Sequence, residues 1–302
     1  MKKLSFLFVF IILLFIYKSS INSINKNIFS NEFLKKSIYR SKNLFLESKN
    51  FSELDKTKFK SCLPILLKKI PLKSTVVIGH AYGRSKGLNL NRNSFISKNI
   101  DKFLEKNKNQ LNAVIFTGDI FAIPTLTKWE KLYNKYEDYF NIYIAPGNHE
   151  ISNLENKKIF ESYIQNKQNI NYPILINESQ FNIILDDSNY KQDLENYKIR
   201  FSKFQNYKDI IIMQHHILVD ELSEYGGTSN YIFTKEKISE IFSKIENVTF
   251  IYGNGGMYFD LPRIACYMHK NVNHILNGVG DFKEDNIIVL SKGKIYRYQI
   301  NK

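Results

Sequence analysis

The feature that most constrains the fold is a pattern that recurs along the chain. A short apolar run, rich in β-branched residues, ends at a turn that presents a polar side chain. Between residues 75 and 149 the pattern occurs at 75–78 with Gly79-His80, at 113–116 with Thr117-Gly118-Asp119, and at 142–145 with Pro146-Gly147-Asn148-His149. Apolar runs of this length that are cut by Gly or Pro are typical of buried strands.

Polar stretches with a helical pattern separate these runs, at about 94–109 and 126–139. Strands that alternate with helices predict a parallel sheet with right-handed crossovers. The carboxyl ends of such strands meet at one edge of the sheet. We therefore expect His80, Asp119, Asn148 and His149 to lie together in space, although they are far apart in the sequence.

The second half of the chain continues the pattern. Further strands are predicted at 181–185, 210–214, 248–252, 274–276, 286–290 and 294–300. The strand at 210–214 leads into His215 and His216, and the strand at 248–252 leads into Gly253 and Asn254. Carboxylate, amide and imidazole groups at one sheet edge are the ligands of a divalent ion, and the imidazoles favour Zn, Fe or Mn over Ca.

This arrangement resembles the calcineurin-like metallophosphoesterases, from about Ser74 to the C-terminus. The matching residues are Gly118-Asp119, Gly147-Asn148-His149-Glu150 and His215. The resemblance implies an α/β fold built as a four-layer α/β/β/α sandwich. It also implies that Asp119 bridges two metal ions and that Asn148 and His215 bind the second. His149 would then contact the substrate phosphate and assist the leaving group.

The chain departs from the family pattern in two blocks. His80 stands where the family has Asp, and Tyr82 where it has His, while Asn254 and Gly256 replace two histidines. The first ion would keep Asp119 and His80, and the second would keep Asp119, Asn148 and His215 with Asn254 as a weak fourth ligand. Asp119 is the one carboxylate that the motifs place, so we expect one or two divalent ions, of Mn, Fe or Zn. Two closely spaced dications need carboxylates to offset their repulsion.

Two functions fit these motifs. The first is a metal-dependent phosphoesterase, a hydrolase that acts on a phosphomonoester or phosphodiester. Its catalytic residue would be His149, and His149, Tyr82 and His216 would contact the substrate, a phosphorylated small molecule or a cell-envelope glycan. A supporting structural role for His216 is the alternative. The second function is a non-catalytic protein of the same fold that binds a glycan, a phosphorylated ligand or a protein partner.

The first residues predict export. Lys2 and Lys3 precede an apolar run from Leu4 to Tyr17, which as a helix would extend about 21 Å, short of a full bilayer span. The length suits a signal peptide, but no clean small-residue cleavage site follows, which favours an uncleaved anchor. We expect an anchor or signal at 1–23, a polar stalk or accessory helices at 24–70, and a metallophosphoesterase-like domain at 71–302. The domain would face the extracytoplasmic side, or be secreted or periplasmic after cleavage.

Composition excludes little. The 302 residues include 43 Lys and Arg against 29 Asp and Glu, a net charge of +14. The lysines are spread along the chain rather than clustered with aromatic residues, so no nucleic-acid partner is expected. Cys62 and Cys266 form no C-x-x-C pair, which excludes a zinc knuckle. They would form a disulfide if the chain is exported, or remain two buried thiols.

Overall fold

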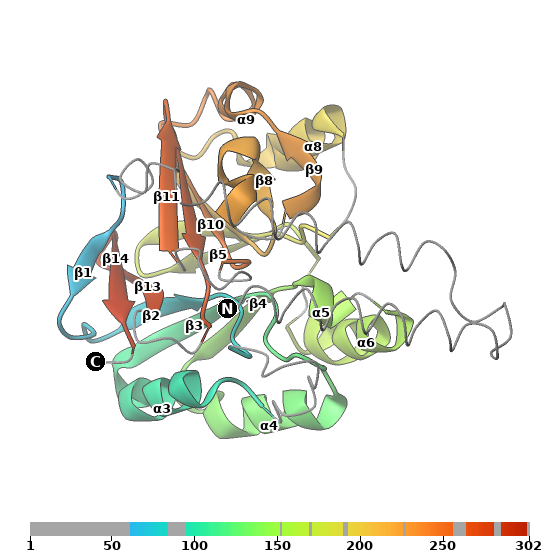
Figure 1. Ribbon diagram of the computed structural model, residues 1–302, viewed down its shortest axis with the longest axis vertical. Coiled ribbons are helices and arrows are strands. Elements are labelled where there is room, and N and C mark those ends of the chain that lie inside the picture. Colours follow the sequence, from blue (N-terminus) through green and yellow to red (C-terminus); the bar gives the residue numbers. More distant parts are fainter. Residues whose placement is uncertain are drawn as a thin grey trace, which may run out of the picture. The chain divides into compact units, whose positions relative to one another are not determined.

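The predicted strands assemble into two six-stranded sheets (Figure 1). The structure is a computed structural model and describes residues 61–83, 95–151, 153–168, 171–189, 193–225, 228–255, 264–280 and 285–300. All of these belong to one compact unit, residues 55–302. The predicted anchor at 1–23 and most of the predicted stalk lie outside the described residues. No helix in the described ranges is long and apolar enough to cross a bilayer.

Sheet A contains the first three predicted strands side by side and parallel. Its order is β1 (Ile65–Leu67), β14 (Lys294–Gln299), β13 (Asn286–Ser291), β2 (Ser74–Ile78), β3 (Leu111–Thr117) and β4 (Asn141–Ala145). Val76 pairs with Val114 and Val114 with Ile142, so the three strands end at about the same level. The predicted convergence of their carboxyl ends follows from this register.

Sheet B is mixed and contains the strand that precedes the two histidines. Its order is β11 (Ile264–His269), β12 (Val272–Asn277), β10 (Asn247–Tyr252), β7 (Asp209–Gln214), β6 (Phe181–Leu185) and β5 (Ile174–Glu178). Strands β6, β7, β10 and β12 are parallel to one another. A small parallel pair, β8 (Ile217–Val219) with β9 (Thr228–Phe233), stands apart from both sheets.

The two sheets pack face to face through alternating apolar side chains. Val77 and Ile115 of sheet A share one buried cluster with Ile211, Ile251 and Ile275 of sheet B. All five are at most 2% exposed. Burying an aliphatic side chain of this size stabilises a fold by about 1.5–3 kcal/mol. Both faces of each central strand are apolar because each face packs on another layer.

Helices cover the outer faces of the sheets. The helices are α3 (Lys98–Asn107), α4 (Leu126–Tyr136), α5 (Asn148–Ile151), α6 (Leu154–Ile159), α7 (Asn166–Gln168), α8 (Leu194–Phe201) and α9 (Lys235–Ile241). Helices α3 and α4 lie along sheet A, and α8 and α9 lie at the other side, by sheet B (Figure 1). Phe103 of α3 and Trp129 of α4 belong to the same buried cluster as Val76 and Val114.

Local sequence explains where these helices begin. Ser97 caps α3, where its hydroxyl accepts a hydrogen bond from the Asn99 N–H at 3.2 Å, and Thr125 caps α4 in the same way. The buried residues of α3, Ile100, Phe103, Leu104 and Asn107, are spaced three and four apart. Such caps satisfy N–H groups that have no partner inside the helix, and this spacing gives a helix one apolar face.

The α/β class predicted from the sequence is confirmed, with two multi-stranded sheets and helices. The four-layer order in detail stays a prediction. Each predicted strand is present, and the predicted helices correspond to α3 and α4. The sequence did not predict β1, β5, β8, β9 or β11, nor the helices from α5, which begins at Asn148, to α9. These elements are short or carry apolar residues without a clear period, and tertiary pairing decides them.

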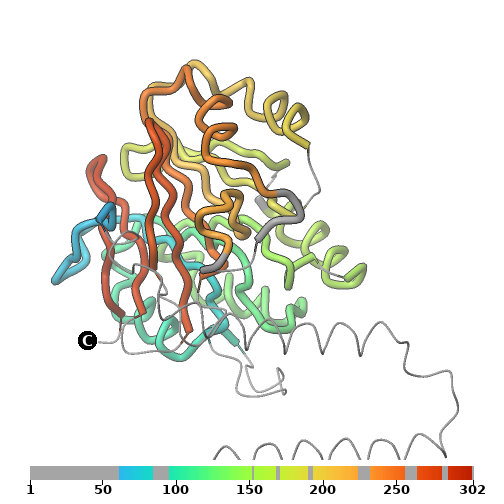
Figure 2. Tube along the Cα trace, turned by 45° about the horizontal axis from the view of Figure 1, so that its top comes forward, coloured from blue at the N-terminus to red at the C-terminus, as the bar shows by residue number. Residues whose placement is uncertain are grey.

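Residues 61–70, which the sequence assigned to a stalk or accessory layer, are part of the sheet structure. Strand β1 pairs in parallel with β14, with Leu66 opposite Arg297. Figures 1 and 2 show β1, in blue, at the same side as the last strands, in red. Cys62 forms a disulfide with Cys266 of β11, with Cα atoms 5.7 Å apart. Of the two alternatives for the cysteines, the structure therefore contains the disulfide.

Candidate functional site

The ends of five strands meet at one place between the sheets. The turns that follow β2, β3, β4, β7 and β10 contain His80, Asp119, Asn148, His215 and Asn254, respectively. Backbone hydrogen bonds join successive turns: His80 N–H donates to the Gly118 carbonyl at 3.2 Å, and Asn254 N–H donates to the His215 carbonyl at 2.9 Å. The convergence predicted from the sequence is thus present in the structure.

Two glycines allow this close approach. A Cβ atom on Gly118, which has φ +82°, would lie 2.5 Å from His215 Nδ1. A Cβ atom on Gly147 would lie 2.4 Å from Asp119 Oδ1 and 2.6 Å from the Asp119 backbone nitrogen. Any other residue at either position would displace the central side chains. The glycines in the two motifs are therefore required by packing as well as by turn geometry.

The Asp119 carboxylate is the centre of the site and is nearly fully buried. His215 Nε2 lies 3.4 Å from Oδ1, while His80 Nε2 and His149 Nε2 each lie 3.8 Å from Oδ2. The His149 backbone N–H donates to Oδ1 at 3.2 Å. Burial raises the pKa of Asp119, but the nearby imidazoles, His215 first, outweigh burial and lower it. Asp119 is therefore ionised at neutral pH.

His215 has one ring nitrogen that is free to bind a cation. Its Nδ1 lies 2.9 Å from the Thr117 carbonyl oxygen, which can only accept, so Nδ1 carries a proton. Its Nε2 is buried, has no hydrogen-bond partner and faces the Asp119 carboxylate. Burial lowers the pKa of His215, but Asp119 has the greater combined effect and the net shift is upward. A place that attracts a proton in this way also attracts a metal ion.

His80 and Tyr82 form an aromatic wall on the other side of Asp119. The ring centroids of Tyr82 and His80 are 4.2 Å apart, and those of Tyr82 and His149 are 5.2 Å apart. Burial lowers the pKa of His80 to about 4 despite the opposing effect of Asp119, so the ring is neutral at pH 7. The 3.8 Å separation from Asp119 is then neither an ion pair nor a hydrogen bond. Burial also raises the pKa of Tyr82, which remains a neutral phenol.

His149 is the most accessible of the three imidazoles around Asp119, with 23% of its side chain exposed. The Ala122 carbonyl oxygen lies 2.6 Å from Nδ1, so Nδ1 carries the proton. Nε2 then faces Asp119 as an acceptor. The Asn156 amide donates to the His149 backbone carbonyl at 2.9 Å, which fixes the start of the helical segment. A positioned, half-exposed imidazole suits proton transfer.

The remaining predicted residues lie around this centre. Asn148 is the first residue of α5 and is half-buried, and Asn254 is buried beside His215. His216 points to Ser188, whose hydroxyl oxygen lies 3.3 Å from the His216 Nδ1 and accepts from its backbone N–H at 2.9 Å. Burial lowers the pKa of His216 to about 3. The roles of Asn148, Asn254 and His216 stay predictions.

The sequence did not predict the role of Glu150. This carboxylate is fully buried and accepts backbone N–H bonds from Asp119, Ile120 and Gly147, each at 2.8 Å. It therefore ties the turn after β3 to the turn after β4. A sequence signal for this role was available. Glu150 is the third residue of a helix that follows a glycine turn, and a Glu at that position can accept bonds from backbone N–H groups before the helix.

The turn after β6 also adjoins the site, which the sequence did not predict. The Asn189 amide donates to the Pro146 carbonyl at 3.0 Å and to Asp187 at 2.8 Å. Asp186 is buried and pairs with Arg200. Burial still raises the pKa of Asp186 to about 7, because desolvation outweighs the effect of Arg200. Asp187 therefore interacts within the turn, and Asp186 interacts with Arg200 of α8.

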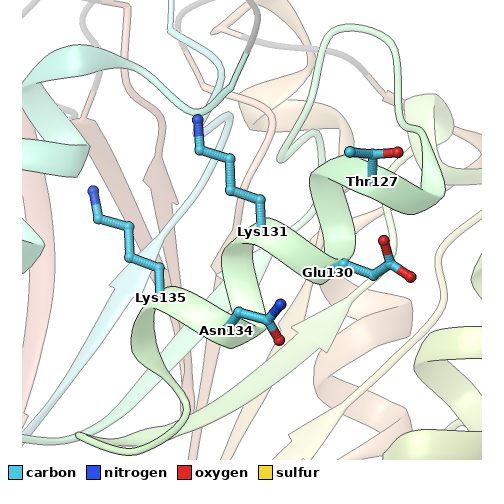
Figure 3. A pocket seen from close by; sticks show the side chains of 5 residues that line it. All are labelled: Thr127, Glu130, Lys131, Asn134 and Lys135. Carbon is cyan, nitrogen blue, oxygen red and sulfur yellow. The ribbon is translucent and has the colours of Figure 1, made fainter.

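A hollow elsewhere on the surface does not belong to the site. It is lined by five residues of α4: Thr127, Glu130, Lys131, Asn134 and Lys135. Figure 3 shows Lys131 and Lys135 projecting from the same side of the helix. Lys135 Nζ lies 2.7 Å from Asp101 Oδ1, and Lys131 Nζ lies 4.5 Å from the centre of the Phe95 ring. Both lysines have partners, and the hollow contains no group of the Asp119 cluster.

The residues present fit a divalent ion at Asp119. His215 Nε2 and Asp119 Oδ1 are two buried acceptors that face each other, which a cation between them would satisfy. Within the described ranges, no three or more His, Cys, Asp and Glu side chains form a group arranged to hold a metal ion. An ion here would therefore also need an amide ligand, and Asn148 is at the right turn to supply one.

Comparison with models of protein families gives a match. A family model described as calcineurin-like phosphoesterase matches residues 90–255, more than half of the chain. The match includes Asp119, Asn148, His149 and His215 and begins after His80 and Tyr82, where the first motif is altered. No curated protein matches the chain significantly.

Proposed function

Because the chain belongs to the calcineurin-like phosphoesterase family, we propose that it is a metal-dependent hydrolase of phosphomonoesters or phosphodiesters. The observation that carries this proposal is the buried pair of Asp119 Oδ1 and His215 Nε2, 3.4 Å apart, beside the half-exposed His149. The family supports a phosphoesterase-type function, and the site retains the groups that such chemistry needs.

In this proposal, Asp119, His215 and Asn148 hold the ion, with Asn254 as a further ligand. When bound, a divalent ion supplies Lewis acidity toward a phosphoryl oxygen and lowers the pKa of water. The protein orients these ligands firmly. Thr117 fixes the tautomer of His215, and Glu150 fixes the backbone of Asp119. Such supporting bonds typically change metal affinity by about 10–100-fold.

His149 transfers a proton in this proposal. Its Nδ1 is held by the Ala122 carbonyl, so Nε2 is the nitrogen that takes or gives a proton at the substrate. Protonation of the leaving oxygen by a positioned imidazole typically contributes about 10²–10⁴-fold in rate. Tyr82, whose ring packs against His149, and His216 would border the bound substrate.

The substrate would be a phosphorylated small molecule or a cell-envelope glycan, met outside the cytoplasm. A net charge of +14 favours anionic substrates. The disulfide between Cys62 and Cys266 supports an oxidising compartment. Lys2, Lys3 and the apolar run after them support export and attachment to a membrane. A C-terminal fusion to a reporter that folds only outside the cytoplasm should be active, and activity of a cytoplasm-only reporter would refute the location.

The activity is tested with purified protein, Mn²⁺, Fe²⁺ or Zn²⁺, and aryl phosphate monoesters and diesters. Asp119→Asn should abolish metal binding and hydrolysis together, because it removes the central negative charge. His149→Ala should retain the metal and lose about 10²–10⁴-fold in turnover. Asp138→Asn, at an exposed carboxylate, is the matched control and should behave as wild type. A wild-type chain that binds a divalent ion but hydrolyses neither ester would favour the non-catalytic binding protein.

A further inference from the structure

We propose that the site holds one divalent ion per chain, because the Tyr82 ring fills the place that a second ion would need. The inference rests on the proposed function, which requires that an ion binds at all. It concerns the number of ions, which the resemblance to two-metal enzymes would set at two. Three features of the described residues carry it.

The first feature is the packing of Tyr82. Its side chain is almost fully buried, and its ring contacts both His80, at 4.2 Å between centroids, and His149, at 5.2 Å. The ring therefore separates the two imidazoles on the Oδ2 side of Asp119. An ion there would need ligand atoms at about 2.0–2.2 Å. The family pattern has an imidazole at this position, and the tyrosine supplies no nitrogen ligand in its place.

The second feature is the shortage of negative charge. Besides Asp119, the acidic side chains of the adjoining turns each interact with a group other than a metal ligand. Both Glu150 oxygens accept backbone N–H bonds, Asp187 accepts from Asn189, and Asp186 pairs with Arg200. Two adjacent dications repel strongly, and a single carboxylate does not offset that repulsion. One dication beside Asp119 leaves a much smaller excess of charge.

The third feature shows where the one ion would bind. On the Oδ1 side, His215 Nε2 is buried without a hydrogen-bond partner and points at the carboxylate from 3.4 Å. Asn148 lies in the turn after β4. The N–H groups on either side of it are already hydrogen-bonded, Gly147 to Glu150 and His149 to Asp119. The Oδ1 side therefore offers Asp119, His215 and the turn of Asn148, while Tyr82 packs against both imidazoles on the Oδ2 side.

The test counts ions in the full-length protein. Wild type, Tyr82→Phe and Tyr82→His are saturated with Mn²⁺, freed of excess ion and analysed by elemental analysis and isothermal titration. Electron paramagnetic resonance then distinguishes isolated Mn²⁺ from a coupled pair. We expect one isolated ion in wild type and in Tyr82→Phe, which keeps the ring. Tyr82→His, which replaces the ring with a ligand, should take up a second ion and show coupling.

Each result has a distinct meaning. Two ions in wild type would overturn the inference and leave the proposed function intact. No bound ion in wild type would defeat the proposed function itself. A folded Tyr82→His variant that still holds one ion would overturn the assignment to Tyr82, and thermal unfolding of all three proteins establishes that they are folded. Tyr82→Phe is the control for any general effect of substituting this buried residue. It should match wild type in the number of bound ions and in the electron paramagnetic resonance spectrum.

Discussion

At the scale of single residues, the site is built by backbone groups as much as by side chains. Asp119 has a left-handed backbone, φ 55°, which its turn can keep only while neighbouring groups hold it. Glu150 supplies that hold by accepting three N–H bonds from two turns. The side chains around Asp119 therefore depend on a carboxylate that is itself fully buried.

Replacing Glu150 should destabilise the protein and weaken metal binding. Glu150→Gln puts an amide NH₂ against buried N–H donors, and an unsatisfied buried donor costs about 1–3 kcal/mol. We expect a loss of roughly 2–4 kcal/mol in the free energy of unfolding, measured as a lower urea midpoint at constant slope. Glu155→Gln, at an exposed glutamate of α6, is the control and should have no effect. Equal midpoints for Glu150→Gln and wild type would show that the three bonds are not needed.

Gly147→Ala should lower metal affinity by roughly 10-fold or more, the range found when groups that support metal ligands are displaced. The added methyl would lie 2.4 Å from Asp119 Oδ1, and neither backbone nor this short side chain can yield easily. Isothermal titration with Mn²⁺ measures the effect. Gly293→Ala is the control, because its methyl would meet nothing nearer than 3.7 Å, although its φ of +68° costs some stability. Unchanged affinity in Gly147→Ala would contradict the packing argument.

At the scale of elements, sheet B has a second polar feature away from the site. On β10 and β12, the ring of His274 stacks on Phe250 and Tyr252, with planes 12° and 4° apart. The Tyr252 hydroxyl lies 2.9 Å from His274 Nδ1. Burial lowers the pKa of His274 to about 3. The fold therefore requires this histidine to be neutral.

His274 should make the protein less stable in acid. The unfolded chain binds a proton near pH 6.5 and the folded chain only near pH 3, so stability falls as pH drops between these values. One such group changes the free energy of unfolding by about 1.4 kcal/mol per pH unit. His80 and His216, whose pKa values are also lowered, act in the same direction. Asp186 and His215, whose pKa values are raised, act in the opposite direction, so the effect of His274 is the difference between the variant and wild type. We measure the free energy of unfolding in urea at pH values from about 4.5 to 7.5. It should depend less steeply on pH in His274→Gln than in wild type, by the equivalent of about one proton. An unchanged pH dependence would contradict the assignment.

At the scale of the whole molecule, the disulfide joins the two ends of the described domain. Cys62 precedes β1, and Cys266 lies on β11, 204 residues later in the sequence. A cross-link over so long a loop strongly restricts the unfolded chain. The disulfide also holds the first described residues against sheet B while β1 pairs with β14 in sheet A.

Removing the disulfide should lower stability by about 2–5 kcal/mol. The double variant Cys62→Ala, Cys266→Ala and the reduced wild type should unfold at similar, lower urea concentrations. Reductant should not affect the double variant, which controls for other effects of the reagent. Because neither cysteine contacts the side chains around Asp119 in the part of the chain that the structure describes, the metal affinity of folded protein should stay unchanged. If fully reduced wild type unfolds at the same urea concentration as oxidised wild type, the disulfide does not have the stabilising role.

The sequence by itself determined that parallel strands alternate with helices near the site, and it indicated which residues lie at its centre. Apolar runs that end in Gly118-Asp119 and Gly147-Asn148-His149 sufficed, because strand periodicity and turn residues act locally. The convergence of His80, Asp119, His149 and His215 then followed from the rule for parallel strands.

Only the tertiary structure decided what each of these side chains contacts. The bonds of Glu150 to two turns, the Tyr82 ring between His80 and His149, and the pairing of β1 with β14 all join residues distant in sequence. The same holds for the choice between a disulfide and two thiols at Cys62 and Cys266. Such contacts depend on burial and on distances between layers, and no local pattern of residues encodes them.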